Sequence, residues 1–521
     1  MDTARILVTI HPEDSVAVAI RAIEAGTTLA PEQTGLPGVN LAVLDPIPAG
    51  HKIALRGMRA GEKVIKYGYP IGAATKDIEA GRHVHTHNLK TALSESAEYR
   101  WNGGGRSPAE SGAKGQRAAL VPTIQAYERK DGKIGIRNEL WIVPTVGCVN
   151  RTAEALARWA DGEIATGSLS GGSLDGCFAW THPYGCSQMG DDHETTRTIL
   201  ADLARHPNAG GVLVLGLGCE NNTVEEFRKA LGDFDADRVR FLVTQRVGDE
   251  IAEGKKLLAE LGERAKRDTR SPVSAARLVM GMKCGGSDGF SGITANALVG
   301  RVTDALAAMG GTPILTEVPE MFGAEQMLMD RCETRELFDR TVELINGFKQ
   351  YYVRHNQVVY ENPSPGNKEG GISTLEDKSC GCVQKGGSAP VRGVLRYGER
   401  IAPGVSGLQL LEGPGNDIVS TTALTAAGAH LILFTTGRGT PLGAPVPTVK
   451  ISSNSALASA KPLWIDFDAG RLLAADGADA ERAITAELLA YILDVASGNE
   501  RTRNETNGYR EIAIFKDGVT L

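Results

Sequence analysis

The stretch GVLVLGLGC, residues 211–219, is an apolar run that ends in glycine and cysteine, and an amphipathic helical pattern follows it at 223–231. The same order recurs in LWIVPTVGC, residues 140–148, and in LVMGMKCGG, residues 278–286. Apolar runs that alternate with amphipathic helices are typical of βα units built around a mainly parallel sheet. The sequence therefore predicts an α/β fold for most of the chain.

The chain of 521 residues is too long for one ordinary core, and its pattern changes along its length. Residues 1–93 contain short alternating runs between turns, which predict a small β domain. Residues 94–122 are polar and rich in glycine and serine, as in a linker. We expect the rest to be a Rossmann-like α/β region in two subdomains, residues 123–355 with the cysteine-bearing strand ends and residues 356–521 at the C-terminal end.

Charge and composition favour a small-molecule partner. The formal net charge is −7 and the sequence has no basic tract, so neither nucleic acid nor a membrane is expected as a partner. Asp2 stands where a secretory signal would be basic, and no apolar run is long enough to span a bilayer, so we expect a cytoplasmic protein. The eight cysteines are then expected to be reduced thiols.

Four cysteines lie in loops at the ends of predicted strands. Cys148, Cys219 and Cys284 end three strands, and Cys186 lies in the turn HPYGCSQ before a predicted helix. Ligands of open α/β sheets bind at the carboxyl ends of the strands. A single cysteine is most often a small buried hydrophobe, but thiolates and imidazoles that come from several loops suit iron or another borderline-soft metal. The absence of a CxxC pair argues against a structural zinc ribbon.

Three histidines alternate in AGRHVHTHNL, residues 80–89. On a strand His83, His85 and His87 would share one face, where they could serve a metal or a substrate. The alternative is the exposed polar face of a half-buried strand.

Loops of the C-terminal region offer ligands for a substrate. Arg438, in TTGRGTPLG, has a planar guanidinium group that can bind a carboxylate through two hydrogen bonds. An arginine in a surface turn, without a role in binding, is an equally good interpretation. Asn367 lies in NPSPGNKEGG, and KSCGCVQKGG, a predicted glycine-rich loop, contains Cys382 and Lys385. GLGCEN resembles half of a dinucleotide fingerprint but lacks its third glycine, so a nicotinamide site has little support.

Long segments run in a fixed order along nearly the whole chain: GYPIGAATKDIEAGRHVHTHNL, RNELWIVPTVGCVN, YGCSQMGDDHETTRT, VLGLGCENN, CGGSDGFSGITAN, LTEVPEMFGAEQMLMDRC, YENPSPGNKEGGISTLEDKS, FTTGRGTP and REIAIFKDGVTL. Together they resemble the altronate/galactarate dehydratase family of sugar-acid dehydratases, whose N-terminal part is a small β-clip called the SAF domain. HVHTHN, GDDHETT and LEDKS resemble the altronate branch.

The resemblance implies a hydro-lyase of hexuronate catabolism that removes water from D-altronate to give 2-dehydro-3-deoxy-D-gluconate. It implies mononuclear iron(II) as the cofactor, with manganese(II) as a substitute, and we expect a homodimer. An iron-sulfur cluster stays open as the alternative, because the candidate ligands are rich in thiols. Galactarate or another hexonate or hexarate is the alternative substrate. A non-catalytic sugar-acid sensor and a thiol-dependent oxidoreductase are alternatives from other classes.

The site hypothesis assigns three roles. In a β-elimination a base removes the C2 proton while a metal that binds the carboxylate and a hydroxyl neutralises the charge that develops. The predicted metal ligands are Cys186, Cys219 and Cys284, with Cys148 in reserve and with His85 and His87 from the β domain. The candidates for the base are His182, Lys283 and Lys385, and the predicted substrate ligands are Arg438, Asn367, Asn416 and Asp417.

Overall fold

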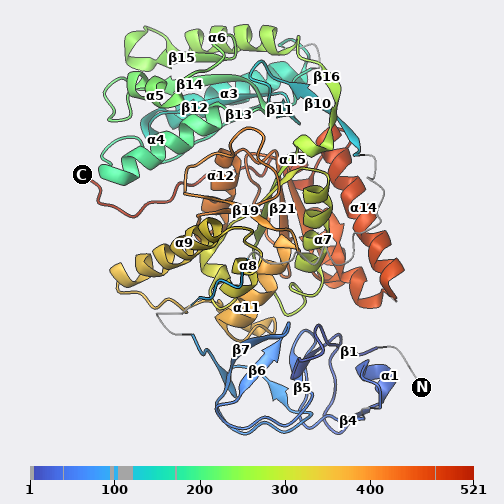
Figure 1. Ribbon diagram of the computed structural model, residues 1–521. Coiled ribbons are helices and arrows are strands. Elements are labelled where there is room, and N and C mark those ends of the chain that lie inside the picture. The colour runs from blue at the N-terminus through green and yellow to red at the C-terminus, as the bar shows by residue number, and fades with distance from the viewer. Residues whose placement is uncertain (1–4, 39, 94–98, 104–120, 170–172, 476) are drawn as a thin grey trace.

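The computed structural model describes residues 5–38, 40–93, 99–103, 121–169, 173–475 and 477–521. Most of the predicted linker, residues 94–122, lies outside this range. Figure 1 shows a small N-terminal β domain at the bottom, a large sheet with its helices in the middle, and a second α/β unit at the top. The predicted α/β class and the small N-terminal β domain are both confirmed.

The N-terminal domain is made of short antiparallel strands. One sheet has the order β1-β2-β5-β8, another the order β6-β7-β9, and β3 pairs with β4. The alternating side chains of these strands fill two small apolar cores. The elements are β1 (Leu7–Val8), β2 (Val16–Ala19), β3 (Thr28–Leu29), α1 (Pro31–Thr34), β4 (Leu41–Ala42), β5 (Lys52–Ala54), β6 (Lys63–Lys66), β7 (Tyr69–Ala74), β8 (His83–Val84) and β9 (Leu89–Lys90).

The upper unit is a parallel sheet of order β13-β12-β14-β15 with helices on both faces. Leu140 and Ile142 of β12 pack against α3 and α6, whereas Trp141 and Val143 point to the opposite face, toward α4. Because helices cover both faces of this sheet, side chains on both sides of β12 and β14 are buried, so the sequences of these strands are continuously apolar. The elements are β12 (Glu139–Pro144), α3 (Asn150–Ala165), β13 (Cys177–Ala179), α4 (Gly190–Ala204), β14 (Ala209–Gly216), α5 (Val224–Leu231), β15 (Val239–Val243) and α6 (Glu250–Ala265).

The central sheet has seven parallel strands in the order β19-β20-β18-β17-β21-β22-β23. Strands that precede residue 355 in the sequence pair with strands that follow it. The subdomain boundary predicted at this residue therefore divides the sequence of a single sheet. Its strands are β17 (Val279–Cys284), β18 (Thr312–Leu315), β19 (Val391–Leu395), β20 (Leu408–Leu411), β21 (Leu431–Thr436), β22 (Thr448–Ser452) and β23 (Phe467–Asp468).

Helices cover both faces of the central sheet, and a small antiparallel sheet of order β11-β10-β16 lies beside it. The helices are α7 (Ala295–Ala308), α8 (Glu325–Met329), α9 (Arg335–Arg354), α10 (Pro365–Glu369), α11 (Leu375–Cys382), α12 (Asp417–Ala427), α13 (Ser455–Ala460), α14 (Gly477–Ser497) and α15 (Arg503–Asn507). The strands of the small sheet are β10 (Thr123–Glu128), β11 (Ile134–Gly135) and β16 (Arg270–Ser274).

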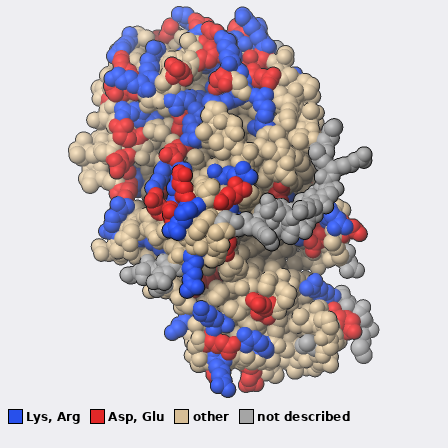
Figure 2. Space-filling view, viewed as in Figure 1, with Lys and Arg blue, Asp and Glu red and all other residues tan. Residues whose placement is uncertain are grey.

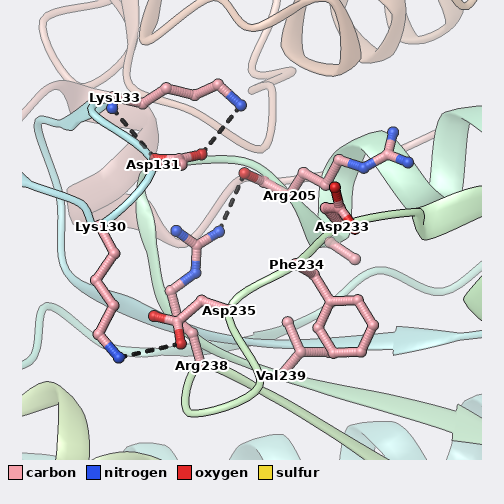
Figure 3. Close-up of a pocket in the computed structure, with 10 residues that line it drawn as sticks. Lys130, Asp131, Lys133, Arg205, Asp233, Phe234, Asp235, Arg238 and Val239 are labelled. Carbon is pink, nitrogen blue, oxygen red and sulfur yellow. Dashed lines mark hydrogen bonds and ion pairs between the residues drawn. The ribbon is translucent and has the colours of Figure 1, made fainter.

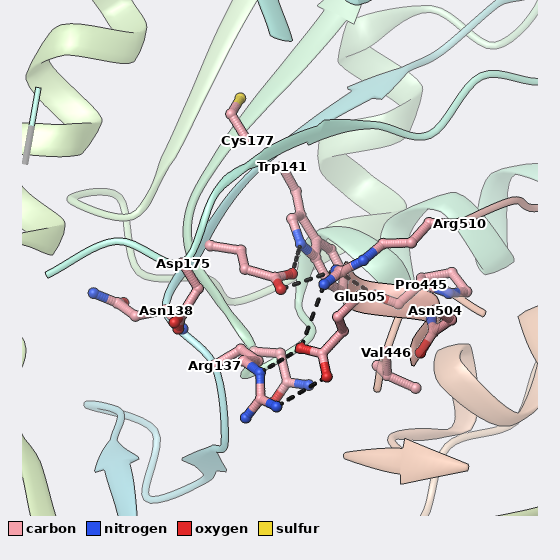
Figure 4. Close-up of polar contacts among 12 residues, drawn as sticks. Arg137, Asn138, Trp141, Asp175, Cys177, Pro445, Val446, Asn504, Glu505 and Arg510 are labelled. Atoms are coloured by element: carbon pink, nitrogen blue, oxygen red, sulfur yellow. Dashed lines mark hydrogen bonds and ion pairs between the residues drawn. The ribbon is translucent and has the colours of Figure 1, made fainter. Parts of the chain in front are cut away.

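A buried ion-pair network joins the upper unit to the C-terminal segment (Figure 4). Arg137 donates to Glu505 over 2.7 Å, and Arg510 donates to Glu139 over 2.9 Å. Trp141 also donates its indole N–H to Glu139 over 2.7 Å. These charges are buried and paired, as a buried charge must be, so the network holds the upper and central sheets together.

The surface carries both signs of charge. In Figure 2 the basic and acidic side chains are interspersed over the upper part of the face shown, and much of the middle is uncharged. Within the part of the chain that the structure describes, no helix combines the length and the apolar character needed to cross a bilayer.

Candidate active site

The carboxyl edge of the central sheet gathers reactive side chains where the strand order changes direction. The chain leaves β17 toward β18 on one side, whereas β21 lies on its other side. Open α/β sheets bind ligands at such a point. Lys283 and Cys284 end β17. Just after β18, Glu317 precedes and Glu320 lies within a 3-10 turn over Val318–Met321.

Helix α11 adds a second set of side chains from far along the sequence. Thr374 caps the N-terminus of α11, and all eight residues of this helix are buried. Lys378 and Cys382 are one helical turn apart, so they share a face. Lys385 follows in the next turn, Val383–Gly386.

Two thiols and one carboxylate meet at this edge. The Sγ atoms of Cys284 and Cys382 are 3.4 Å apart, and Glu320 Oε2 lies 3.2 Å from the first and 3.0 Å from the second. In the described residues this is the one group of three such ligand atoms that all lie within 4.8 Å of one another. Sulfur and oxygen donors suit a borderline-soft metal. The structure thus contains a buried site that could hold a metal ion, here called the Cys–Glu–Cys group.

Three lysines surround the Cys–Glu–Cys group. Lys385 Nζ lies 3.0 Å from Cys284 Sγ and 3.1 Å from Glu317 Oε2. Lys283 pairs with Glu317 and, over 3.1 Å, with Asp417. Lys378 Nζ, the third, lies 2.8 Å from Glu320 Oε1. All three lysines are buried.

The lysines are cationic in this arrangement. Burial by itself lowers the pKa of Lys283, but Glu317 and Asp417 outweigh it and raise the pKa above its ordinary value. Burial also opposes the charge of Lys385, yet Cys284 and Glu317 raise its pKa as well. A lysine base near neutrality needs a depressed pKa, so both lysines are suited to stabilise negative charge.

The Cys–Glu–Cys group includes a charged carboxylate. Burial raises the pKa of Glu320, but Lys378, at 2.8 Å, Lys283 and Lys385 outweigh burial and lower it, so its carboxylate is charged. The hydrogen bond to Cys284 and burial raise the pKa of Cys382, which keeps its thiol protonated. A bound cation would replace such thiol protons. The group therefore has the donor chemistry for a metal.

The N-terminal domain docks on α11 beside the site. Asp377 Oδ2 pairs with Lys52 over 2.8 Å, and Asp377 Oδ1 pairs with Lys66 over 3.0 Å, with all three side chains buried. A small cavity there is lined by Lys66 and Tyr67 from the N-terminal domain and by Cys382 from the Cys–Glu–Cys group. The two domains therefore form the surroundings of the site together.

The three histidines gather, although only His83 lies on a strand. Strand β8 ends at Val84, and the chain then turns, with the N–H of Asn88 bonded to the carbonyl of His85 over 3.0 Å. The ring centroids of His83 and His85 are nevertheless 5.6 Å apart, and those of His83 and His87 5.3 Å. A turn thus replaces the predicted alternation, because Asn88 also accepts the N–H of His85 on its side chain.

A fourth imidazole joins them at the domain boundary. His51 Nδ1 lies 3.0 Å from His83 Nε2, and His51 Nε2 lies 3.1 Å from the carbonyl of Glu369. His85 Nδ1 lies 3.3 Å from the hydroxyl of Ser373. Burial and neighbouring imidazoles lower the pKa of His83 to about 3. The rings of His51, His83 and His85 are therefore neutral near pH 7. His51 and His85 contact the segment before α11.

The other three predicted thiol ligands lie on the upper sheet instead. Cys148 follows β12, Cys186 lies between β13 and α4, and Cys219 follows β14, and all three are exposed. They belong to the four-stranded sheet, whereas Cys284 ends a strand of the seven-stranded one. The structure thus divides the predicted thiol set between two sheets.

His182 also lies in the upper unit, where both nitrogens of its ring form hydrogen bonds with backbone groups. Its Nε2 lies 2.9 Å from the carbonyl of Pro144, and its Nδ1 accepts the N–H of Tyr184 over 3.1 Å. Burial lowers its pKa to about 4. Both ring nitrogens are therefore occupied, and the ring is suited to hold the turn before Cys186.

The predicted substrate ligands lie at the carboxyl edge of the central sheet: Arg438 in a loop, Asn367 in α10, and Asn416 and Asp417 at the start of α12. Arg438 donates to the carbonyl of Gly366 over 3.3 Å and pairs with Glu369 over 2.9 Å, near Asn367. The amide of Asn367 is buried and donates to the carbonyl of Ser287 over 2.8 Å. On the neighbouring loop, Asn416 caps α12 and Asp417 pairs with Lys283.

Sequence reasoning did not assign Glu317, Glu320, Lys378 or Cys382 to the site. The first two lie in LTEVPEMFG directly after the run TPIL, where a carboxylate at a strand end is a usable signal. Cys382 was expected in a loop, and only the helix places it over the strand ends.

A separate cavity of about 310 Å³ lies at the edge of the upper unit (Figure 3). Lys130, Asp131, Lys133 and Asp235 line it, and their charges are paired: Lys133 contacts Asp131 over 3.1 Å, and Lys130 contacts Asp235 over 3.4 Å. Its lining contains no thiol or imidazole, so the metal-ligand chemistry lies elsewhere.

Three family models match most of the chain. Residues 5–92 match the altronate/galactarate dehydratase SAF domain, residues 126–266 the second domain of D-galactarate dehydratase/altronate hydrolase, and residues 275–520 the C-terminal domain of D-galactarate/altronate dehydratase. The resemblance seen in the sequence is therefore confirmed over all three segments.

Characterised relatives match the chain from end to end. The altronate dehydratase of Bacillus subtilis (strain 168) is 51% identical over 98% of this chain and 99% of its own length. The altronate dehydratase of Escherichia coli (strain K12) is 49% identical over 98% and 99%. The galactarate dehydratase (L-threo-forming) of Escherichia coli (strain K12) is 30% identical over 97% and 96%. The chain belongs to the D-galactarate/altronate dehydratase family.

Proposed function

We propose that this protein is an altronate dehydratase, a hydro-lyase that converts D-altronate into 2-dehydro-3-deoxy-D-gluconate. Identity of about one half, over almost the full length of two altronate dehydratases, supports this substrate over galactarate. The buried Cys–Glu–Cys group beside three lysines is the structural observation that supports a lyase reaction at this edge.

The reaction places negative charge on the substrate. Removal of the C2 proton beside a carboxylate gives an enediolate, and the C3 hydroxyl must then leave as water. A metal ion bound by Cys284, Glu320 and Cys382 would supply Lewis-acid stabilisation of this charge. We propose iron(II) for this site, with manganese(II) as a substitute, because thiolate and carboxylate donors accept either ion.

The lysines have a role that follows from their charge. Lys283 and Lys385 lie on either side of Glu317, so their ammonium groups can stabilise the enediolate without leaving their places. An ammonium group can also give a proton to the leaving hydroxyl. We therefore assign them to charge stabilisation and proton donation rather than to removal of the C2 proton.

Substrate binding is proposed for the loops around the group. Arg438 is exposed enough to reach a carboxylate and is already placed among the loops of the carboxyl edge. A bidentate contact from its guanidinium would fix one end of the sugar acid. Asp417 lies next to Lys283 and could accept a substrate hydroxyl. His85 and His87 could approach the same end of the site from the N-terminal domain.

The experiment is a substrate panel with defined metals. The reduced protein is loaded anaerobically with iron(II), manganese(II) or zinc(II) and incubated with hexonates and hexarates, and the 2-oxo acid is measured with semicarbazide. We expect turnover of D-altronate with iron(II). Turnover of galactarate alone would assign the other substrate, and binding without product would support a sensor.

Matched variants test the metal site. Cys382→Ser and Glu320→Gln should lower both the bound mononuclear metal and kcat by about 10–100-fold or more, since each removes a donor. Cys332→Ser is the control, because this thiol is also buried but bonds to Thr341 away from the group. Full metal content and activity in both Cys382→Ser and Glu320→Gln would contradict the assignment.

A further inference from the structure

Three exposed thiols stay outside the Cys–Glu–Cys group. Cys148, Cys186 and Cys219, here called the rim cysteines, are exposed, whereas the other five cysteines of the chain are buried. Free cysteine is among the most buried residue types. Three exposed thiols at the carboxyl edge of one parallel sheet are therefore unusual, and this edge is where such sheets bind ligands.

The loops that carry the rim cysteines are bonded to one another. Gly147 donates its N–H to the carbonyl of Tyr184 over 2.8 Å. Asn222 donates its backbone N–H to the carbonyl of Gly185 over 3.0 Å and its side-chain amide to the carbonyl of Thr145 over 3.1 Å. Each rim cysteine is within three residues of one of these bonds, so the three thiols emerge from one interlocked set of loops.

The loops approach so closely that they have little freedom. A Cβ on Gly185 would lie 1.9 Å from the carbonyl oxygen of Thr145, so only glycine fits before Cys186. Ser187, just after it, has a φ of 60°, which is unfavourable for a residue other than glycine. The buried carboxylate of Glu220 also accepts the hydroxyl of Thr145 over 2.7 Å. This rigidity suits a preorganised ligand set.

Three helix N-termini and one side-chain amide lie close to the rim cysteines. Helices α3, α4 and α5 each begin a few residues after one rim cysteine, so three positive helix ends face the same edge. Gln245 donates its side-chain N–H to the sulfur of Cys219 over 3.4 Å, as donors around metal-bound thiolates do.

The three rim sulfur atoms, as they are placed in the structure, are too far apart to bind one ion together. In the described residues, only the Cys–Glu–Cys group has three ligand atoms within 4.8 Å of one another. Metal–sulfur bonds of about 2.3 Å allow two sulfurs on one ion to be at most about 4.6 Å apart. At least one pair of rim sulfurs is farther apart than this, so a species several ångströms wide is needed.

We propose that Cys148, Cys186 and Cys219 hold a [4Fe–4S] cluster whose fourth iron has no cysteine ligand. Four thiolates hold such a cluster when all its irons are ligated by protein, and the remaining cysteines in the described ranges are buried in other places. The fourth iron is left for an oxygen ligand such as hydroxide or a small 2-hydroxy carboxylate. This site is separate from the Cys–Glu–Cys group, so it does not depend on the proposed function.

The test measures the cluster itself. The full chain is isolated without oxygen, and iron, acid-labile sulfide and visible absorbance are measured. We expect about four sulfides per chain, with at least as many irons, and a broad iron–sulfur absorbance. Cys148→Ser, Cys186→Ser and Cys219→Ser should each lower the sulfide content, and the triple variant should reduce it to background.

The controls separate this proposal from the metal site of the central sheet. Cys382→Ser and Cys332→Ser should keep the sulfide and the visible absorbance, and circular dichroism and Tm should show that every variant is folded. Iron without sulfide in the wild-type chain would overturn the proposal. Sulfide retained by a folded triple variant, or lost from a folded Cys382→Ser variant, would overturn it equally, and none of these readouts requires turnover.

Discussion

At the scale of single residues, Glu317 determines the charge balance of the candidate active site. Its carboxylate pairs with both Lys283 and Lys385, and it accepts the backbone N–H of Cys284 over 3.1 Å. Its φ is 71°, in the left-handed region that non-glycine residues rarely adopt. Such a conformation costs on the order of 1–3 kcal/mol and is found where the surroundings enforce it, often at functional sites.

Glu317→Gln should therefore be strongly destabilising. The change leaves two buried ammonium groups without their shared counter-charge, and removing one partner of a buried pair costs about 3–5 kcal/mol. Urea unfolding followed by circular dichroism measures this, and kcat should fall as well. Glu333→Gln is the control: its pair with Arg392 is exposed, so it should cost about 1 kcal/mol or less. Equal stabilities for the two variants would contradict this role of Glu317.

At the scale of elements, α11 connects two parts of the molecule. One side of this short buried helix places Lys378 and Cys382 against Glu320, and another side presents Asp377 to Lys52 and Lys66 of the N-terminal domain. Burial raises the pKa of Asp377, but the two lysines outweigh it and lower the pKa, so its carboxylate stays charged. Docking of the N-terminal domain and the position of Cys382 thus depend on the same helix.

Asp377→Asn should loosen the N-terminal domain. The variant keeps the shape of the side chain but leaves Lys52 and Lys66 buried without an anion, at a cost of about 3–5 kcal/mol. Hydrogen exchange should become faster in β5, β6 and α11, and activity should fall. Glu62→Gln in the same domain removes an exposed pair with Arg56, and the glutamine oxygen can still accept the N–H of Arg59, so exchange should be unchanged. Unaltered exchange in Asp377→Asn would exclude this docking role.

At the scale of the whole molecule, two buried histidines lie where the upper unit meets the central sheet. His206 Nε2 lies 3.1 Å from the carbonyl of Ala429, and His430 Nδ1 accepts the N–H of Val279 over 3.0 Å. Asn208 donates to the carbonyl of His430 over 3.0 Å. Burial lowers the pKa of His430 to about 4, and burial together with His430 lowers that of His206.

Stability should therefore fall in mild acid. Because the folded-state pKa of His430 is below its unfolded value of 6.5, its contribution is complete above pH 6.5 and is lost as the pH falls toward 4. The difference of about 2.5 pKa units corresponds to about 3 kcal/mol as an order of magnitude. Tm measured from pH 7.5 to 4.5 should decline less steeply in His430→Asn, whose amide oxygen can replace Nδ1. His11→Asn, at an exposed position, should keep the wild-type slope.

Much of the architecture was predictable because it depends on local periodicity. The runs 211–219 and 278–286 form β14 and β17 nearly as expected, and the helix expected at 223–231 is α5. The alternation of HVHTH predicted a strand through all three histidines, but β8 contains only His83 and Val84, because Asn88 accepts the N–H of His85 and closes a turn. The roles given to the predicted site residues stay predictions.

The sequence by itself determined the family, the α/β class and the reactive residue types at the strand ends, because these follow from local pattern and from long ordered motifs. Only the tertiary structure decided which thiols meet. Cys284 contacts Cys382, 98 residues away, and Glu320, 36 residues away. The rim cysteines remain on another sheet. The physical reason is that strand pairing, burial and helix placement bring distant residues together, and none of these is encoded in the spacing of cysteines along the chain.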